Sequence, residues 1–203
     1  MKKVLFVDCC IRREASRSKE LAEYFIQKLE ETGAYEIERL CLMDENLSYF
    51  PMVSFCREKP FWRRENSTIL VSAMRTSLRR RIKIVIAAPF WDLSFPALLK
   101  VYIENLCVDG ITFHSDETGL HGLCKADHMV FLTARGGIYT DSPMEQGACY
   151  LEQMAVFFGI AKFDCVAAEG LDIGAWPVAE LMEQAKEKAA EVAKGILNKR
   201  NTV

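Results

Sequence analysis

Two aromatic residues, Phe90 and Trp91, follow an apolar run at residues 82–88 that is typical of a buried strand. Ser94 and Pro96 come next and indicate a helix start, because a serine hydroxyl can accept a first-turn N–H and proline loses nothing there. The loop between them therefore lies past the carboxyl end of a strand, where open α/β sheets bind ligands. Either the two rings cover a ligand, or they form a small hydrophobic cluster.

A second loop places hydroxyl and basic side chains ahead of a helical pattern, after a strand expected at residues 3–8. Ser16 and Ser18 can donate hydroxyl hydrogen bonds to an anion, and the first turn of the helix adds unpaired N–H groups. Three arginines add positive charge: Arg12, Arg13 and Arg17. The loop predicts a phosphate site; the alternative is that Ser16 only caps the helix among solvated arginines.

A third loop contains paired glycines, Gly136 and Gly137, after an apolar run at residues 128–134. Glycine lets backbone N–H groups approach a ligand closely, although Gly-Gly also suits a simple turn. Neither Gly-x-Gly-x-x-Gly nor Gly-x-x-x-x-Gly-Lys-Ser/Thr occurs, which argues for a monophosphate. A phosphate cradle, an aromatic wall and glycine donors together indicate a pocket for flavin mononucleotide (FMN).

Strand and helix patterns alternate along the whole chain, which predicts βαβ units and a parallel sheet. We expect an α/β fold of the flavodoxin-like type, a doubly wound five-stranded parallel sheet in the order 2-1-3-4-5 with helices on both faces. The expected strands are 3–8, 35–42, 82–88, 128–134 and 161–168, and the expected helices 18–32, 67–81, 94–107, 142–158 and 176–197. Residues 1–203 should form one domain, with insertions at about 43–65 and 109–123.

Composition excludes several classes of protein. Of 203 residues, 50% are hydrophobic and 27% charged, and the net charge of −2 offers no basic field for nucleic acid or an anionic membrane. No apolar stretch approaches the length of a membrane span, so we expect a cytoplasmic protein without a membrane partner. The eight cysteines are scattered, with no Cys-x-x-Cys pair, and are expected to be structural thiols rather than ligands of a metal.

With these loops in this order, the chain resembles the FMN-dependent NAD(P)H:quinone oxidoreductases and azoreductases of the flavodoxin-like fold. The resemblance covers nearly the whole length. Four motifs carry it: Ser16-Arg17-Ser18, Ala87 to Leu93, Arg135-Gly136-Gly137 and Gly110 to Phe113. The chain departs from the family at Cys10, where serine is frequent, and at Asp92, where asparagine is frequent.

The resemblance implies roles for particular residues. The FMN phosphate would be held at Ser16-Arg17-Ser18, and its pyrimidine side would meet backbone N–H groups of residues 134–137. The implied cofactor-binding residues are Cys10, Ser16, Arg17, Ser18, Pro89, Phe90, Trp91, Asp92, Leu93, Ala134, Arg135, Gly136 and Gly137. The implied substrate residues are Phe113, His114 and Phe157. His114 could donate a proton or hydrogen bond to the acceptor, but the reading as a solvent-exposed side chain is favoured over that role.

The resemblance also implies an activity. FMN would be tightly bound, NADH or NADPH would give it hydride, and a planar quinone or azo compound would take the hydride in a second step. Such proteins are homodimers, so segments 43–65 and 110–123 would close over the neighbour's flavin. Two alternatives remain: a flavodoxin-type electron carrier without its own NAD(P)H activity, and a redox-responsive interaction protein, suggested by Cys9-Cys10.

Overall fold

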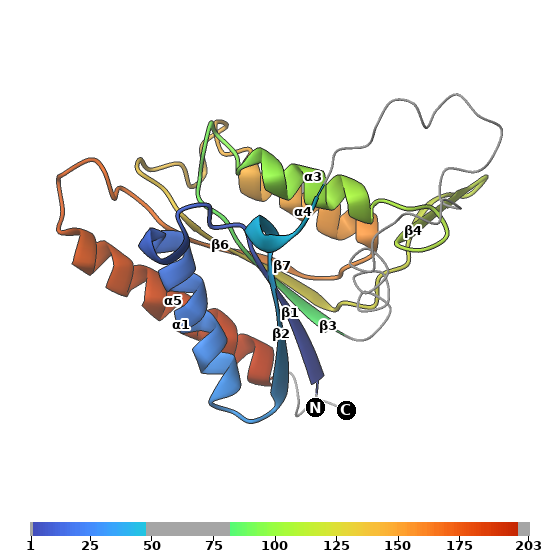
Figure 1. The fold of residues 1–203 in the computed structure, drawn as a ribbon, viewed down its shortest axis with the longest axis horizontal. Coiled ribbons are helices and arrows are strands. Elements are labelled where there is room, and N and C mark those ends of the chain that lie inside the picture. Colours follow the sequence, from blue (N-terminus) through green and yellow to red (C-terminus); the bar gives the residue numbers. More distant parts are fainter. Residues whose placement is uncertain (1, 48–81, 199–203) are drawn as a thin grey trace.

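The computed structural model of the chain describes residues 2–47 and 82–198, and within them five strands form one parallel sheet (Figure 1). The strands are β1 (Lys2–Asp8), β2 (Tyr35–Cys41), β3 (Ile82–Ala87), β6 (His128–Ala134) and β7 (Phe163–Ala168). Their order is β2-β1-β3-β6-β7. Numbered along the sheet, this is the order 2-1-3-4-5, and the fold prediction is confirmed.

Helices cover both faces of the sheet, as Figure 1 shows. Helices α1 (Arg17–Glu30) and α5 (Val178–Asn198) pack on one face, and α3 (Ala97–Leu106) and α4 (Gly147–Phe158) on the other. Two single turns of 3₁₀ helix, η1 (Arg13–Ala15) and η2 (Leu42–Asp44), follow β1 and β2. Each layer of helices therefore buries one side of the sheet.

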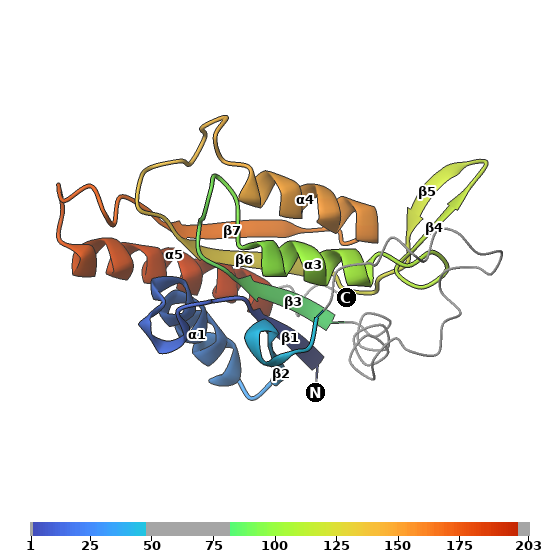
Figure 2. The same ribbon diagram turned by 45° about the horizontal axis from the view of Figure 1, so that its top comes forward.

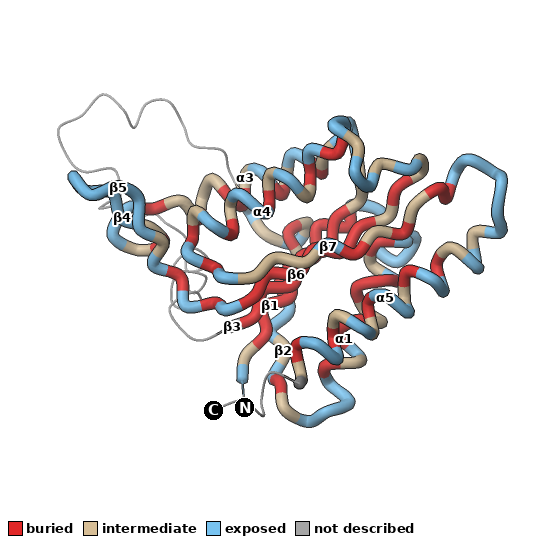
Figure 3. Tube along the Cα trace, turned by 180° about the vertical axis from the view of Figure 1, so that it is seen from behind, coloured by how far each residue is buried: buried red, intermediate tan, exposed pale blue. Residues whose placement is uncertain are grey.

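Alternate residues of the central strands supply the two halves of the core. In β1, Leu5 and Val7 pack with the α3/α4 layer, whereas Val4 and Phe6 pack with the α1/α5 layer. Successive side chains of a strand point to opposite faces, so a strand covered on both faces must be apolar throughout. Figure 3 shows the result as buried residues along β1, β3 and β6. Burying each such side chain contributes roughly 1.5–3 kcal/mol.

Both ends of the first long helix agree with the signals in its sequence. Ser16 caps α1, and its Oγ accepts the N–H of Lys19 at 3.4 Å. Gly33 follows the helix in the left-handed region, with φ of 62°, and its N–H donates to the carbonyl of Glu30. Glycine takes that conformation without the steric penalty of a Cβ.

The prediction that Ser94 caps the next helix is wrong. Helix α3 begins at Ala97, with Pro96 in the cap position and no side-chain cap. The backbone of Ser94 instead closes a tight turn with Trp91: the N–H of Ser94 donates to the Trp91 carbonyl at 2.8 Å, and the N–H of Trp91 to the Ser94 carbonyl at 3.1 Å. The residue before a proline is also biased away from helix, which delays the start further.

Helix α4 likewise begins later than the predicted residue 142, at Gly147. The carboxylate of Glu145 accepts the N–H of Ala148 at 2.8 Å and that of Cys149 at 3.2 Å. A negatively charged acceptor satisfies the unpaired first-turn donors and complements the helix dipole. The acidic residue, not Ser142, therefore sets this helix start.

The glycine-rich segment after α3 forms the expected hairpin, with strands β4 (Phe113–Asp116) and β5 (Gly119–Gly122). It extends beyond the ends of α3 and α4, as Figure 2 shows. Gly122 packs against the end of α4 so closely that a Cβ there would lie 2.0 Å from the backbone nitrogen of Gly159. Backbone contact between two glycines thus anchors the hairpin.

Several predictions concern residues that the structure does not describe. The helix expected at 67–81 and most of the 43–65 insertion lie outside the described residues. The division into a single domain with two insertions stays a prediction. In the part of the chain that the structure describes, no helix is both long and apolar enough to cross a membrane.

Candidate functional site

A surface hollow lies at the carboxyl ends of β1, β3 and β6, where the three predicted loops meet. It is lined by Arg12, Ser16, Arg17, Ser18, Pro89, Phe90, Trp91, Ala134, Arg135, Gly136, Leu171 and Asp172. Backbone hydrogen bonds join the loops behind it: the N–H of Cys9 donates to the Ala87 carbonyl, and the N–H of Phe90 to the Ala134 carbonyl. The parallel sheet therefore brings together residues more than a hundred positions apart in sequence.

One end of the hollow gathers hydrogen-bond donors of the kind that suit an anion. Ser16 and Ser18 are both buried, and the Oγ of Ser18 accepts the N–H of Ala134 at 2.9 Å. That bond fixes the start of α1 against the end of β6 and leaves the hydroxyl proton of Ser18 free to donate. The first N–H groups of α1 lie beside it without intrahelical acceptors, and the helix dipole is positive there.

Arg17 lies at the hollow, but its guanidinium is paired. Its Nη1 donates to Oδ1 of Asp172 at 2.9 Å, and both side chains are largely exposed. Asp172 and Leu171 also line the hollow and belong to the loop after β7, where the sequence has no recognisable site motif. Leu171 is buried and is the kind of residue that sequence assigns to a core, so no motif distinguished it.

The aromatic loop makes a two-residue turn that is strained. Asp92 and Leu93 have φ of 50° and 66°, and they lie between Trp91 and Ser94, whose backbones are hydrogen-bonded to each other. Two successive positive φ values define a type I′ turn, which asparagine and glycine favour and leucine does not. Within residues 2–47 and 82–198, no acceptor is recorded for the N–H groups of Asp92 and Leu93, which leaves both available to a ligand.

The two rings of this loop have different surroundings. Phe90 packs against Tyr139, with ring centroids 4.5 Å apart, and the Arg135 guanidinium lies 5.2 Å from its ring centre. Trp91, by contrast, is 41% exposed. Phe90 thus belongs in part to a small hydrophobic cluster, the alternative considered for both rings. Trp91 lines the hollow and keeps exposed surface there.

The glycine loop has fewer free donors than predicted. The N–H of Ala134 donates to Ser18, and that of Arg135 to the carbonyl of Ala168 at 2.8 Å. No acceptor among the described residues is recorded for the N–H groups of Gly136 and Gly137. The backbone contacts predicted for residues 134–137 therefore reduce to the two glycines.

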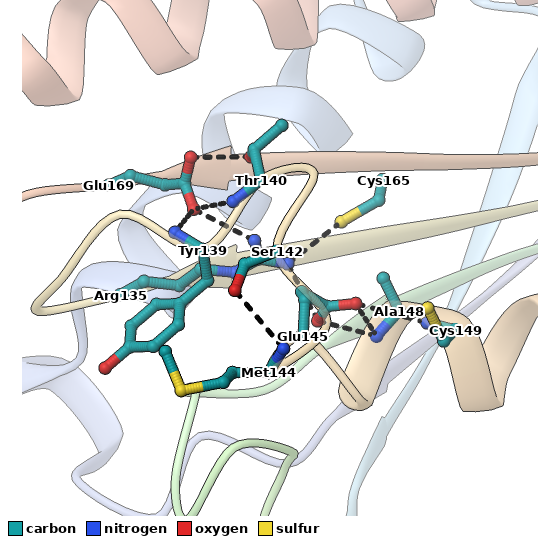
Figure 4. Close-up of polar contacts among 10 residues, drawn as sticks. All are labelled: Arg135, Tyr139, Thr140, Ser142, Met144, Glu145, Ala148, Cys149, Cys165 and Glu169. Atoms are coloured by element: carbon teal, nitrogen blue, oxygen red, sulfur yellow. Dashed lines mark hydrogen bonds and ion pairs between the residues drawn. The ribbon is translucent and has the colours of Figure 1, made fainter.

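The side chain of Arg135 points away from solvent into a buried ionic network (Figure 4). Its Nη1 donates to Glu169 and its Nη2 to Glu145, each at 3.0 Å. Glu169 also accepts the N–H groups of Tyr139 and Thr140 at 2.8 and 2.9 Å. One arginine thereby ties the loop after β6 to the start of α4 and to the end of β7. The sequence motif Arg-Gly-Gly gave no sign of this role.

Burial of the Glu169 carboxyl opposes its ionisation, but hydrogen bonds from Thr140, Tyr139 and Arg135 outweigh burial and hold its pKa below the ordinary value of 4.5. A lowered folded-state pKa means that the ionised carboxylate stabilises the fold. That stabilisation is complete above the unfolded pKa and is lost as the pH falls through the folded one. The loop carrying Gly136 and Gly137 is therefore held by a charge that persists at neutral pH.

Other predicted site residues do not line the hollow. Cys10 lies behind the phosphate end with no exposed surface, and burial together with the neighbouring Asp8 raises its thiol pKa. Phe113 and Phe157 contact each other, with ring centroids 4.7 Å apart, at the hairpin end of α4. His114 is exposed there and pairs with Asp109 at 3.1 Å.

The hairpin end is remote from the hollow of the same chain. Helix α4 starts beside the aromatic loop, where the N–H of Gln146 donates to the Leu93 carbonyl at 3.0 Å. Phe157 lies ten residues after Gly147 along the helix, which is about 15 Å at 1.5 Å per residue. The structure thus brings the predicted cofactor loops together and leaves the predicted substrate residues apart from them.

A sheet of this order with a ligand hollow at its carboxyl edge defines the flavodoxin-like class of α/β proteins. The family model described as flavodoxin-like fold matches residues 2–193. The chain is 36% identical to FMN-dependent NADH:quinone oxidoreductase 2 of Clostridium acetobutylicum over 199 residues, and the match covers 96% of this chain and 99% of the relative. A protein of the same name from Clostridium perfringens is 35% identical, with the same coverage.

Solved structures of azoreductases have the same fold as this chain. An azoreductase from Bacillus anthracis str. Sterne superposes with a TM-score of 0.81 and 28% identity, covering 95% of this chain and 99% of that one. The azoreductase AzrA gives a TM-score of 0.79 and 30% identity, covering 94% and 98%. The chain belongs to the flavodoxin-like fold family, among the FMN-dependent NADH:quinone oxidoreductases and azoreductases. The predicted resemblance is confirmed.

Replacing Leu93 by glycine should stabilise the protein. A left-handed non-glycine residue is penalised by about 1–2 kcal/mol, which glycine avoids, so we expect Leu93→Gly to raise the free energy of unfolding by about 1 kcal/mol. Urea titration of the flavin-free chain measures it. Leu120→Gly is the control, since Leu120 is similarly exposed but has an ordinary strand backbone; it should not stabilise. A loss of stability in Leu93→Gly would contradict the prediction that the backbone of Leu93 is strained.

Replacing Glu169 by glutamine should destabilise the fold in a pH-dependent way. We expect Glu169→Gln to lower the free energy of unfolding by about 1–3 kcal/mol at pH 7, because hydrogen bonds to a charged acceptor are lost. The difference from wild type should begin to shrink below the unfolded pKa of about 4.5 and should vanish below the lower folded pKa, where wild-type Glu169 is also neutral. Denaturant titrations from pH 7 to 3 test this. Glu187→Gln, on the exposed face of α5, should change little at any pH.

Proposed function

We propose that the chain binds FMN in this hollow and uses it to transfer hydride from NADH to a quinone or an azo compound. The main support for the proposal is that three loops meet at one hollow. One loop offers hydroxyl and basic side chains, one offers aromatic rings, and one offers backbone N–H groups of glycine. The names of the relatives, FMN-dependent NADH:quinone oxidoreductase and azoreductase, support the same activity. No protein nucleophile and no metal enter the proposal.

The residues present fit a flavin monophosphate. The phosphate would lie at the start of α1, where Ser16 and Ser18 carry the hydroxyls and the helix supplies N–H groups. The isoalloxazine would lie along Trp91 and the strained turn, with Gly136 and Gly137 donating to its polar edge. The free N–H groups of Asp92 and Leu93 add donors from the other side. FMN, when bound, supplies the hydride chemistry, and the protein supplies stacking, orientation and electrostatics.

Exposed apolar side chains beside the hollow support a ping-pong sequence. Trp91 and Leu93 are 41% and 42% exposed, so apolar surface borders the hollow on its solvent side. Planar molecules stack on such surfaces, and nicotinamide and acceptor would occupy the same place in turn. NADH is the proposed donor because the relatives carry it in their names. The seven free cysteines of the described residues support the cytoplasmic location that we propose.

We also propose that the working unit is a homodimer, in which the hairpin end of one subunit completes the site of the other. Exposed apolar side chains gather at this end: Val156, Leu120 and Leu123 are 68%, 49% and 38% exposed. Apolar surface of this kind is typical of an interface rather than of a solvated face. Phe113 and Phe157, too far from their own hollow, would then line the acceptor side of the neighbour's.

The full chain, incubated with FMN and desalted, should retain one flavin per subunit and be bleached by NADH under anaerobic conditions. Turnover with a quinone should follow, with parallel lines in double-reciprocal plots as expected for a ping-pong sequence. Absorbance of the flavin and stopped-flow mixing measure both steps. A colourless protein after desalting would contradict the proposal. A protein that retains flavin colour but is bleached by neither NADH nor NADPH would favour an electron carrier.

Val156→Glu should separate the subunits. A charge in an apolar interface loses hydration without gaining a partner, so we expect monomers at micromolar concentration and a loss of quinone turnover of about tenfold or more. Sedimentation velocity and steady-state rates measure both effects. Trp176→Glu is the control: Trp176 is 51% exposed but lies before α5, away from the hairpin. A wild-type protein that sediments as a monomer would overturn the dimer.

A further inference from the structure

Four basic residues lie in the segment between β1 and the first turn of α1, and three of them already have a carboxylate partner. The pairs are Arg13 with Asp44 at 2.7 Å, Arg17 with Asp172 at 2.9 Å, and Lys19 with Glu14 at 2.6 Å. Each pair is close to neutral overall. The positive charge that sequence assigns to this loop is therefore mostly compensated within the protein.

Arg12 is the exception. Across residues 2–47 and 82–198, its guanidinium has no recorded ion pair or hydrogen bond, and the side chain is exposed. It lines the hollow together with Ser16 and Ser18, whose buried hydroxyls mark the anion end. An uncompensated guanidinium beside buried hydroxyl donors is the arrangement that recognises a phosphate, because its planar fork matches phosphate oxygens.

The backbone explains why two consecutive arginines separate. Arg13 adopts a left-handed conformation, with φ of 51°, and its N–H donates to the Cys10 carbonyl at 2.7 Å. The carbonyl of Arg12 accepts the N–H of Ala15 at 3.1 Å, which fixes the turn on its other side. The tight turn sends Arg13 toward Asp44 after β2 and leaves Arg12 at the hollow.

We propose that Arg12 supplies the positive charge that binds the phosphate of the cofactor, a role that the Ser-x-Ser motif would give to Arg17. The inference rests on the proposed flavin site and specifies its phosphate end. Arg17 is the weaker candidate because Asp172 neutralises it, and a dianion approaching Arg17 also approaches that carboxylate. The backbone N–H of Arg17 still contributes at the helix start.

The test compares FMN with riboflavin, which lacks only the phosphate, on the flavin-free full chain without pyridine nucleotide. We expect Arg12→Gln to raise the Kd of FMN about tenfold, the loss of one charge-assisted contact, and that of riboflavin less than twofold. The matched control is Arg13→Gln, which removes the neighbouring charge and should change neither Kd more than twofold. Quenching of flavin fluorescence gives both constants.

A second variant separates the two arginines. Arg17→Gln combined with Asp172→Asn removes an ion pair without changing net charge, and we expect it to weaken FMN less than Arg12→Gln does. The proposal is overturned if the double variant loses more FMN affinity than Arg12→Gln. It is also overturned if Arg12→Gln and Arg13→Gln behave alike, or if Arg12→Gln changes only the KM for NADPH, which would assign Arg12 to a 2′-phosphate.

Binding of FMN and riboflavin to the wild-type chain distinguishes failure of the flavin proposal from failure of the Arg12 proposal. A wild-type chain that binds neither FMN nor riboflavin would remove the site altogether. A wild-type chain that binds both, with FMN tighter, keeps the site and lets the variants decide on Arg12. Increasing salt should weaken FMN in the wild type more than in Arg12→Gln, because a screened charge contact is present only in the former.

Discussion

The parallel register of three neighbouring strands is the constraint on which the site depends. Asp8 of β1 pairs with Ala87 of β3, and Ala87 pairs with Leu132 of β6, so the three strands end side by side. Because parallel strands share a direction, the loops that follow them must emerge at one edge. The start of α1 with its two buried serines, an aromatic turn and a glycine loop thereby become neighbours, although no two are close in sequence.

The edge of the sheet is also where the molecule departs from low-energy local structure. A leucine in a left-handed conformation, a buried arginine with two carboxylates, and backbone donors without protein acceptors all occur there. Features of this kind are stable only when the surrounding fold enforces them, and they concentrate at binding sites. The ionic network around Arg135 is the enforcing element for the glycine loop, since Glu169 holds the N–H groups of Tyr139 and Thr140.

Sequence was sufficient for the fold because the core strands are apolar throughout and the helices carry one apolar face each, patterns that depend only on local spacing. It was less sufficient at the helix starts: Ser94 has the right side chain for a cap, but its backbone is already used by Trp91. The sequence predicted the loops of the candidate site but not the long-range contacts within it. Motifs located the loops, whereas the pairing of Arg17 with Asp172 joins residues 155 positions apart, and no local pattern reports it.

A crystal structure of the full chain with bound FMN would show whether one FMN spans the three loops. We expect the phosphate at the start of α1, within hydrogen-bonding distance of the Ser18 hydroxyl. The isoalloxazine should lie between Trp91 and the N–H groups of Gly136 and Gly137. FMN bound elsewhere on the chain, or a phosphate pointing away from α1, would contradict the proposed site.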